Sequence, residues 1–317
     1  MKRLRLILLF GVLTPLIGIG TRAFAEPVAA VTINGSLPGK QIEVNGVTMH
    51  VFDQGSGPAV LLVHGMPDSS GVWKYQVPPL LKAGYRVIVP DLVGSGQSDK
   101  PRDLKHYEGP QVVKDLVALL DTLGIKQVDY VGHDWGAGFG WSMIMTHPDR
   151  VRRFVTLTVG LPMVTMPLGS FEQNRWDWYM LLNTHPLAPE LYKANNCSFF
   201  RMLIATHPEV DEVVSRLCRQ PEGFRPVVAW DVANPMASAW LDAERPASQR
   251  TLPEVRTPTL GIGGGRDVFT WESQLRDTGK YLRGPWRYEL IPNASHWVML
   301  DHPEQVNELI LEWLSQK

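Results

Sequence analysis

Asp134 lies within residues 128–137, where a short apolar run gives way to a helical pattern. Gly132 precedes it by two residues, and Gly136 and Ala137 follow at two and three residues. Small residues at this spacing permit a sharp strand-to-helix turn, which pushes the central side chain outward in strained backbone geometry. A carboxylate held in this way is a candidate nucleophile. The alternative is that Asp134 only caps the helix, as Asp commonly does.

Two further side chains would complete a nucleophilic site. His296 lies between the last predicted strand and the last predicted helix, and it is the candidate general base. Asp267 follows a run of three glycines and is the candidate for orienting that histidine. Residues 159–163, at the end of the strand predicted at residues 154–159, contain no acidic residue that could orient His296 instead of Asp267. His296 could also be a structural histidine, and Asp267 an Asx-turn residue.

Backbone N–H groups beside the nucleophile are the expected oxyanion hole. Met66 lies in the loop after a buried strand, and Trp135 directly follows the nucleophile. We expect their N–H groups to face the same point. His64 and His133 are interpreted as side chains that fix their loops rather than as ligands. Because His, Cys and carboxylate residues follow no metal-ligand spacing, neither a metal nor another cofactor is expected.

The elements that must position these residues alternate along the chain. Apolar runs typical of buried strands occur at residues 59–63, 87–90, 128–131, 154–159, 260–262 and 288–291. Helical patterns lie near residues 73–83, 111–123, 135–146 and 271–282, and a last amphipathic helix begins near Pro303. This alternation predicts an α/β fold with a mainly parallel sheet and helices on both faces.

The alternation stops between residues 161 and 256. This stretch is rich in Trp, Met, Pro and Phe and lacks a clear buried-strand run. We therefore predict that residues 161–256 form a helical cap inserted into a core made of residues 26–160 and 257–317. The two cysteines, Cys197 and Cys218, lie in this cap. An oxidising compartment would permit a disulfide between them, whereas free Cys is commonly buried, and the sequence leaves both possibilities open.

Residues 1–25 have the features of a bacterial secretory signal. A basic start precedes an apolar run at residues 6–20, and Ala23 and Ala25 provide the small-x-small pattern that signal peptidases recognise. The apolar run has 15 residues and contains Pro15, so it is shorter than the roughly 20 residues that span a bilayer. We expect cleavage after Ala25, export to the periplasm or the medium, and no stable membrane insertion.

The charge balance argues against a nucleic-acid partner. The chain has 31 Lys and Arg residues, 32 Asp and Glu residues and a formal net charge of −1. The predicted signal contains four basic residues and no acidic residue, so its removal would change the formal net charge to −5. Such a chain lacks the basic field that binding to phosphates requires.

Together, the motifs resemble those of one enzyme family. The segments 64–67 (His-Gly-Met-Pro), 132–137 (Gly-His-Asp-Trp-Gly-Ala) and 295–297 (Ser-His-Trp) are similar to motifs of the epoxide hydrolases of the α/β-hydrolase fold. The resemblance covers about residues 41–314, and the chain order of nucleophile, acid and histidine is that of the fold. Haloalkane dehalogenases share the aspartate nucleophile and the Trp that follows it. The resemblance implies the α/β-hydrolase fold and the opening of epoxides to vicinal diols.

Opening an epoxide requires a proton donor opposite the nucleophile, and a phenol suits that task. Residues 175–182 resemble the Trp-Tyr segment of the family, which makes Tyr179 the implied donor. Tyr179 could instead be an aromatic residue of the cap interior. Residues 229–234 match the segment that holds a second tyrosine in the family, but Asp231 stands in its place. Asp231 could be a replacement acid, a solvent-facing residue or a sign of altered activity.

The expected reaction forms a covalent ester on Asp134, which water hydrolyses after activation by His296. The expected partners are a small apolar epoxide and water. A haloalkane dehalogenase that uses the same Asp134, Asp267 and His296 is the alternative. Such an enzyme would hold the halide with an N–H of Trp135 and a second N–H donor. The second donor would be Trp176, Trp178 or Trp230. A second alternative is a non-catalytic secreted binding protein on a hydrolase scaffold.

Overall fold

An eight-stranded sheet forms the centre of the molecule. The computed structural model describes residues 35–161, 178–235 and 254–316. Its strands are β1 (Lys40–Val44), β2 (Val47–Gln54), β3 (Ala59–Val63), β4 (Arg86–Pro90), β5 (Val128–His133), β6 (Val151–Leu157), β7 (Thr259–Gly264) and β8 (Trp286–Ile291). Their order in the sheet is β1-β2-β4-β3-β5-β6-β7-β8. β2 pairs antiparallel with β1 and β4, and every pair from β4 to β8 is parallel. The predicted mainly parallel sheet is confirmed.

The hairpin of β1 and β2 was not predicted from the sequence. Asn45 and Gly46 connect these strands with φ angles of 46° and 81°. Positive φ at both residues is the geometry of a type I′ turn, which Asn-Gly favours and which joins two antiparallel strands directly. This dipeptide is the signal that could have revealed both strands.

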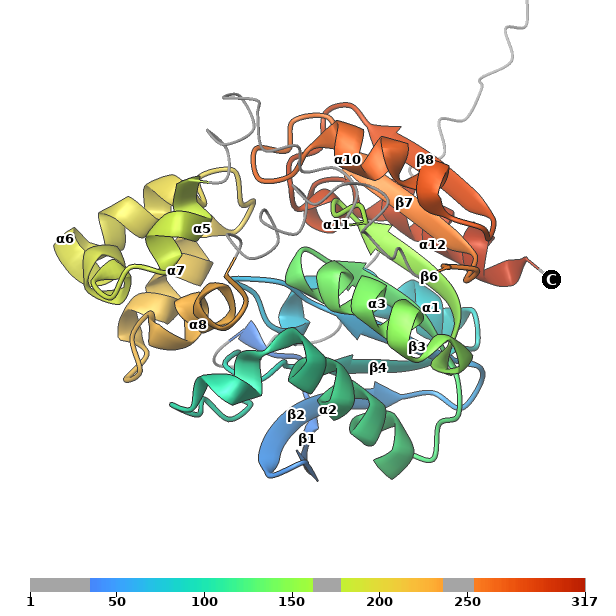
Figure 1. Cartoon of the computed structure of the whole chain (residues 1–317), viewed down its shortest axis with the longest axis horizontal. Coiled ribbons are helices and arrows are strands. Elements are labelled where there is room, and N and C mark those ends of the chain that lie inside the picture. Colours follow the sequence, from blue (N-terminus) through green and yellow to red (C-terminus); the bar gives the residue numbers. More distant parts are fainter. Residues whose placement is uncertain (1–34, 162–177, 236–253, 317) are drawn as a thin grey trace, which may run out of the picture.

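Helices cover both faces of the sheet (Figure 1). On β3, Val60 and Leu62 pack in the same apolar cluster as α1 (Val77–Lys82) and α12 (Pro303–Ser315). Leu61 and Val63 pack with α2 (Gly109–Thr122) and α3 (Trp135–Thr146). Because successive side chains of a strand point to opposite faces, the two pairs of helices lie on opposite sides of the sheet. The other core helices are α10 (Glu272–Asp277), α11 (Val298–Asp301), η2 (Ser70–Trp73), η3 (Leu104–Tyr107), η4 (Pro148–Arg150) and η6 (Thr278–Tyr281).

The predicted boundaries hold for α3 and for the start of α12 at Pro303, and they shift in the other predicted helices. The single helix predicted near residues 73–83 is instead η2 followed by α1. Pro78 and Pro79 favour the first turn of a helix, where the N–H groups have no partner within the helix, so the helix begins just before them. The helix predicted near residues 271–282 is divided into α10 and η6.

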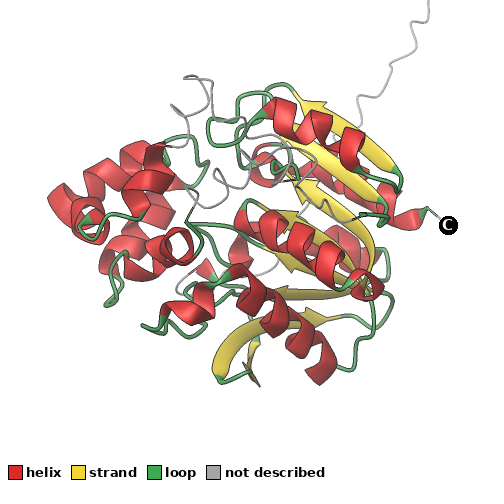
Figure 2. Ribbon diagram, viewed as in Figure 1, coloured by secondary structure: helices red, strands yellow, loops and turns green. Residues whose placement is uncertain are grey.

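The helices between β6 and β7 lie apart from the sheet layers (Figure 2). They are α5 (Trp178–Asn183), α6 (Ala188–Leu203), α7 (Val210–Arg219) and α8 (Arg225–Ala233), drawn in yellow to orange in Figure 1. We call residues 178–235 the lid. The predicted cap bounds, 161 and 256, remain a prediction because residues 162–177 and 236–253 lie outside the described residues.

A disulfide between Cys197 and Cys218 joins α6 to α7, with their Cα atoms 6.3 Å apart. The pairing that the sequence left open is therefore present. It lies where α6 departs from helical geometry, because Asn195, Asn196 and Cys197 have positive φ. The disulfide ties the kinked part of α6 to its neighbour.

The predicted secretory signal lies outside the described residues, so its cleavage remains a prediction. Among the residues that the structure does describe, no helix is both long enough and apolar enough to cross a membrane.

Candidate active site

Asp134 connects β5 to α3 with φ 52° and ψ −124°. An L residue adopts this region only where its surroundings enforce it, because the conformation is strained. Gly136 permits the sharp turn, since a Cβ at that position would lie 2.1 Å from the carbonyl oxygen of Val63. The side chain of Asp134 makes no capping hydrogen bond to α3. The geometry is that of the expected elbow and not that of a helix cap.

The carboxylate of Asp134 faces a set of hydrogen-bond donors. The N–H of Met66 donates to its Oδ1 over 2.9 Å, and Nε2 of His296 lies 3.3 Å from its Oδ2. Burial acts to raise the pKa of Asp134, but the hydrogen bond and charge of His296, with help from the N–H of Trp135, hold it below its usual value. Asp134 is therefore ionised at neutral pH, as a nucleophile must be.

His296 is oriented by Asp267. The Nδ1–H of His296 donates to Oδ2 of Asp267 over 2.9 Å. Asp267 also accepts hydrogen bonds from the N–H of Phe269 over 2.7 Å and from the hydroxyl of Thr270 over 2.6 Å. Asp267 thus holds its own turn and the histidine at the same time, so both interpretations drawn from the sequence describe it.

His296 lies buried between two carboxylates. Burial acts to lower its pKa, but Asp267 and Asp134 outweigh that effect and raise it to about 10. Burial likewise acts to raise the pKa of Asp267, but the charge and hydrogen bond of His296 hold it below its usual value. Because these groups titrate together, the imidazole stays protonated while Asp134 carries its charge.

His64 and His133 fix the loops around the site. The Nε2 of His64 accepts the N–H of Leu92 over 2.9 Å, and its Nδ1 contacts the carbonyl oxygen of Gly65 at 2.8 Å. The Nε2 of His133 contacts the carbonyl oxygen of His296 at 3.0 Å. Burial lowers the pKa of His64, and it lowers the pKa of His133 to about 4. Both rings are therefore neutral at pH 7 and serve as hydrogen-bonding supports.

A pocket next to Asp134 brings the core and the lid together. Trp135 and His296 line it from the core, and Tyr179 lines it from the lid with Leu203 and Ile204. The Tyr179 ring packs edge-on against Phe269, with ring centroids 5.4 Å apart. The structure therefore places the Tyr179 implied by the resemblance in the same pocket as the carboxylate.

Asp231 lies on α8, and only 2% of its surface is exposed. This burial excludes the solvent-facing possibility. The Nδ2 of Asn183 donates to Oδ2 of Asp231 over 2.6 Å, while Oδ1 has no hydrogen-bond partner among the described residues. Burial raises the pKa of Asp231 to about 8, the charge of Asp134 adds to the effect, and the Asn183 hydrogen bond opposes it. Asp231 is therefore mainly protonated at neutral pH.

Sequence reasoning missed the partners of Asp231. The hydroxyl of Tyr192 donates to Oδ1 of Asn183, which fixes the orientation of the amide. Asn183 and Tyr192 are 1% and 0% exposed. No motif marked either residue, because the contact joins three different helices of the lid.

Metal ligands were not expected from the sequence. Within the described ranges, no group of three or more His, Cys, Asp or Glu side chains is arranged to hold a metal ion.

Comparisons with known proteins place this geometry in context. Residues 58–303 match the model of the alpha/beta hydrolase fold family. The chain is 28% identical over 312 residues to Epoxide hydrolase A of Mycobacterium tuberculosis (strain ATCC 25618 / H37Rv), a match that covers 86% of this chain and 96% of that protein. It is also 28% identical over 304 residues to Bifunctional epoxide hydrolase 2 of Sus scrofa, and it spans only 53% of that longer protein.

Solved structures show a similar fold. A mutant of an epoxide hydrolase from Bacillus megaterium matches with a TM-score of 0.77 and 22% sequence identity. The match covers 87% of this chain and 100% of that one. At this identity, the likeness concerns the fold alone.

Proposed function

This chain belongs to the alpha/beta hydrolase fold family, and on that premise we propose that it hydrolyses epoxides to vicinal diols through a covalent ester on Asp134. One observation carries the proposal. The ionised Asp134 carboxylate stands at an elbow between the N–H of Met66 and the Asp267-oriented His296, in a pocket that also contains Tyr179. The relatives that are named epoxide hydrolases support it. The proposed substrate is a small apolar epoxide, because apolar side chains such as Leu203 and Ile204 line the pocket.

In the first half-reaction, a carboxylate oxygen of Asp134 attacks an epoxide carbon. The carbon–oxygen bond of the ring breaks, and Tyr179 donates its phenolic proton to the leaving oxygen. The product is a glycol monoester on Asp134, and the tyrosinate recovers a proton from solvent. A general acid is needed here because an alkoxide is a poor leaving group.

In the second half-reaction, His296 acts as the base. Esterification removes the negative charge of Asp134. Because that charge helped to raise the pKa of His296, the pKa of His296 falls when the ester forms. The imidazole then loses its proton to solvent, and the neutral ring takes a proton from water as the water oxygen attacks the carboxyl carbon of the ester. The N–H groups of Met66 and Trp135 hold the oxyanion. Collapse releases the diol, whose oxygen takes the proton from His296. The new carboxyl group of Asp134, which contains one oxygen from water, then gives its proton to His296, and this restores the carboxylate and the protonated imidazole.

An isotope experiment tests the covalent path directly. A single turnover in H₂¹⁸O, with enzyme in excess over styrene oxide, should place the label in Asp134 and not in the diol, because water attacks the ester carbonyl. Label found in the diol after the first turnover would show direct attack of water on the epoxide and would refute the covalent path. Asp134→Asn is the matched control, since it keeps the shape of the side chain but removes the nucleophilic charge.

A haloalkane dehalogenase remains the second candidate function, and one observation favours keeping it in the test. The indole Nε1 of Trp230 is buried without a hydrogen-bond partner among the described residues, and its ring lies 6.2 Å from that of Trp135. Trp178 is 42% exposed, and Trp176 lies outside the described residues. A panel of epoxides and bromoalkanes decides between the two functions: halide release without diol formation would replace the epoxide hydrolase proposal.

We also propose that the protein is exported. The signal-like segment at residues 1–25 supports this, and the Cys197–Cys218 disulfide is compatible with an oxidising compartment. N-terminal sequencing of the protein recovered from the periplasm or medium of an expressing bacterium should begin at Glu26. Full-length protein confined to the cytoplasm would contradict the export proposal.

A further inference from the structure

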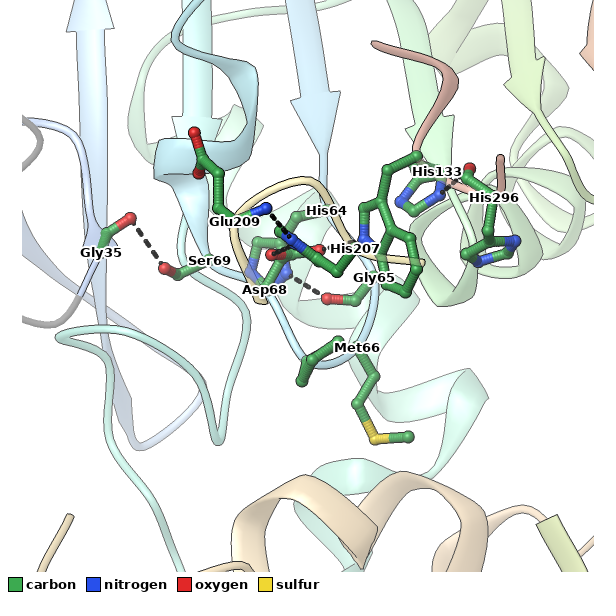
Figure 3. A network of polar contacts seen from close by, with 12 residues as sticks. Gly35, His64, Gly65, Met66, Asp68, Ser69, His133, His207, Glu209 and His296 are labelled. Atoms are coloured by element: carbon green, nitrogen blue, oxygen red, sulfur yellow. Dashed lines mark hydrogen bonds and ion pairs between the residues drawn. The ribbon is translucent and has the colours of Figure 1, made fainter. Parts of the chain in front are cut away.

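Asp68 is a buried carboxylate that three parts of the site share, although the proposed mechanism does not use it. Only 4% of its surface is exposed. It lies two residues after Met66, in the loop that supplies the proposed oxyanion-hole N–H. Figure 3 shows it beside His207 of the lid, with Gly65 and Met66 on the same loop.

The first contact of Asp68 is with the lid. The Nε2 of His207 lies 3.2 Å from Oδ1 of Asp68, and Nδ1 of the same ring accepts the N–H of Glu209 over 2.9 Å. Because Nδ1 is an acceptor, Nε2 carries the proton and donates it to Asp68. Glu209 in turn pairs with Lys74 of the core. His207 is only 2% exposed, so this lid-to-core contact is shielded from solvent.

The second contact is with the loop of the base. The indole Nε1–H of Trp297 donates to Oδ2 of Asp68 over 2.8 Å, and Trp297 directly follows His296. The rings of Trp297 and His207 lie 4.4 Å apart, and those of Trp297 and His296 lie 5.2 Å apart. Both oxygens of Asp68 are therefore occupied, one by the lid and one by the base loop.

The third contact lies within the oxyanion loop itself. The N–H of Asp68 donates to the carbonyl oxygen of Gly65 over 3.1 Å, which closes a turn around Met66. That turn aims the N–H of Met66 at Asp134. Burial acts to raise the pKa of Asp68, but its interactions with His207 and the indole N–H of Trp297 hold it below its usual value. The carboxylate is thus a permanent acceptor for both donors.

We propose that Asp68 is a positioning residue that couples the lid to the loop of His296, the base of ester hydrolysis. One oxygen of Asp68 holds His207 of the lid, and the other holds Trp297, next to His296. The inference rests on the proposed epoxide hydrolase function. Loss of the carboxylate would release the lid contact and the base-loop contact together. Loss of one donor would release only one of them.

Variants that remove only one of the two hydrogen-bond donors separate the effect of the lid contact from that of the base-loop contact. Trp297→Phe keeps an aromatic ring but removes the N–H, so ester hydrolysis by His296 should slow at least tenfold while ester formation changes by less than about threefold. His207→Phe keeps the packing against Trp297 but frees the lid, so ester formation should slow and KM should rise. His207→Gln can place an amide N–H near the former Nε2, and it should restore most of the lost activity.

Asp68→Leu has a similar size but no acceptor oxygen, so it should show both defects at once. Its combination with Trp297→Phe should hydrolyse the ester no more slowly than Asp68→Leu alone, because both substitutions break the same hydrogen bond. Asp129→Leu is the matched control. Asp129 is also a fully buried carboxylate with charged partners, but it lies at the opposite end of β5 from Asp134. It should lower stability without changing the ratio of the two rates.

Rapid-quench mass spectrometry with styrene oxide measures both rates for each folded variant. Unchanged ester formation, ester hydrolysis and KM in Trp297→Phe and His207→Phe would overturn the role of Asp68, even where Asp68→Leu does not fold. Equal slowing of both steps in every variant would overturn it as well, because it indicates a general loss of structure. Wild-type protein that forms neither ester nor diol from any epoxide would instead overturn the proposed function and this role with it.

The hydrogen bond to Trp297 also has a readout that is independent of activity. The indole N–H resonance that disappears in Trp297→Phe should exchange slowly with solvent in the wild type and at least tenfold faster in Asp68→Leu, which has no acceptor oxygen. Equal exchange in the two proteins would refute the contact.

Discussion

Replacing Asp231 by Asn tests the position at which this chain departs from the family that it resembles. The pKa of Asp231 is raised to about 8 because the carboxyl is buried. If its proton serves ring opening together with Tyr179, the rate follows the protonated fraction, which decreases as the pH rises. That fraction falls from about one half at pH 8 to about one eleventh at pH 9, so ester formation should fall about fivefold over this interval. The fall occurs well below the pH at which a tyrosine near pKa 10 titrates.

The assay is single-turnover ester formation, measured by rapid quench and intact-protein mass between pH 5 and pH 10. Asp231→Asn should form the ester about tenfold more slowly at pH 7, as expected for the loss of one of two general acids, and should show no decrease near pH 8. Tyr179→Phe is the complementary variant, and its remaining activity should follow the titration of Asp231. Wild-type and Asp231→Asn rates that coincide at every pH would end the replacement-acid hypothesis and leave Tyr179 as the donor.

The same pKa has a consequence for stability that needs no substrate. The folded-state pKa of Asp231 is raised, so the protonated form stabilises the fold at low pH, and this contribution is lost as the pH rises from about 4 through about 8. A shift of this size corresponds to at most roughly 6 kcal/mol. Urea unfolding of the wild type, compared with Asp231→Asn, should therefore show the variant gaining relative stability between pH 5 and pH 9. A stability difference that is independent of pH would contradict the raised pKa.

Three further predictions follow from the site and the lid. His296→Gln should gain the mass of one epoxide and then hydrolyse the ester about 10² to 10⁴ times more slowly than the wild type, because the general base is missing. A His296→Gln protein that turns over substrate without ever gaining mass would show that His296 is not the base. Tyr179→Phe should slow ester formation at least tenfold at pH 7 while ester hydrolysis stays within about threefold, as rapid quench would measure; equal slowing of both steps would contradict a donor role. The double variant Cys197→Ser, Cys218→Ser should have a free energy of unfolding about 3 kcal/mol lower than the wild type, because the disulfide closes a loop between residues 21 apart. Urea titrations without reductant measure this difference. An unchanged urea midpoint would show that the disulfide does not constrain the unfolded chain.

The sequence predicted the groups that depend on local geometry. Asp134 is positioned by its neighbouring glycines, and His296 follows the last strand of the sheet, so chain order and parallel pairing bring both to the same sheet edge. The α3 helix and the six parallel strands are likewise local patterns of apolar residues. The missed hairpin of β1 and β2 also had a local signal in Asn45 and Gly46.

The groups that depend on distant contacts could not be predicted. The protonation of Asp231 depends on burial against α5 and on Asn183, 48 residues away in the chain. Asp68 meets Trp297 across 229 residues and His207 across 139. No periodicity or motif spacing predicts such contacts, because they depend on the tertiary packing of elements that are far apart in the chain.

The position of His296 between two carboxylates gives the proposed reaction its order. While Asp134 is ionised, its charge and that of Asp267 keep the imidazole protonated, so His296 cannot take a proton from water. Water in the empty site is therefore not activated, and the nucleophile meets the epoxide first. Formation of the ester cancels one of the two charges, and only then does the imidazole become a base. The Nδ1 contact to Asp267 persists throughout, so the ring keeps its orientation while its charge changes. His296 therefore has two roles in sequence. Its positive charge lowers the pKa of Asp134 before the reaction, and the formation of the ester then allows it to act as the base for hydrolysis.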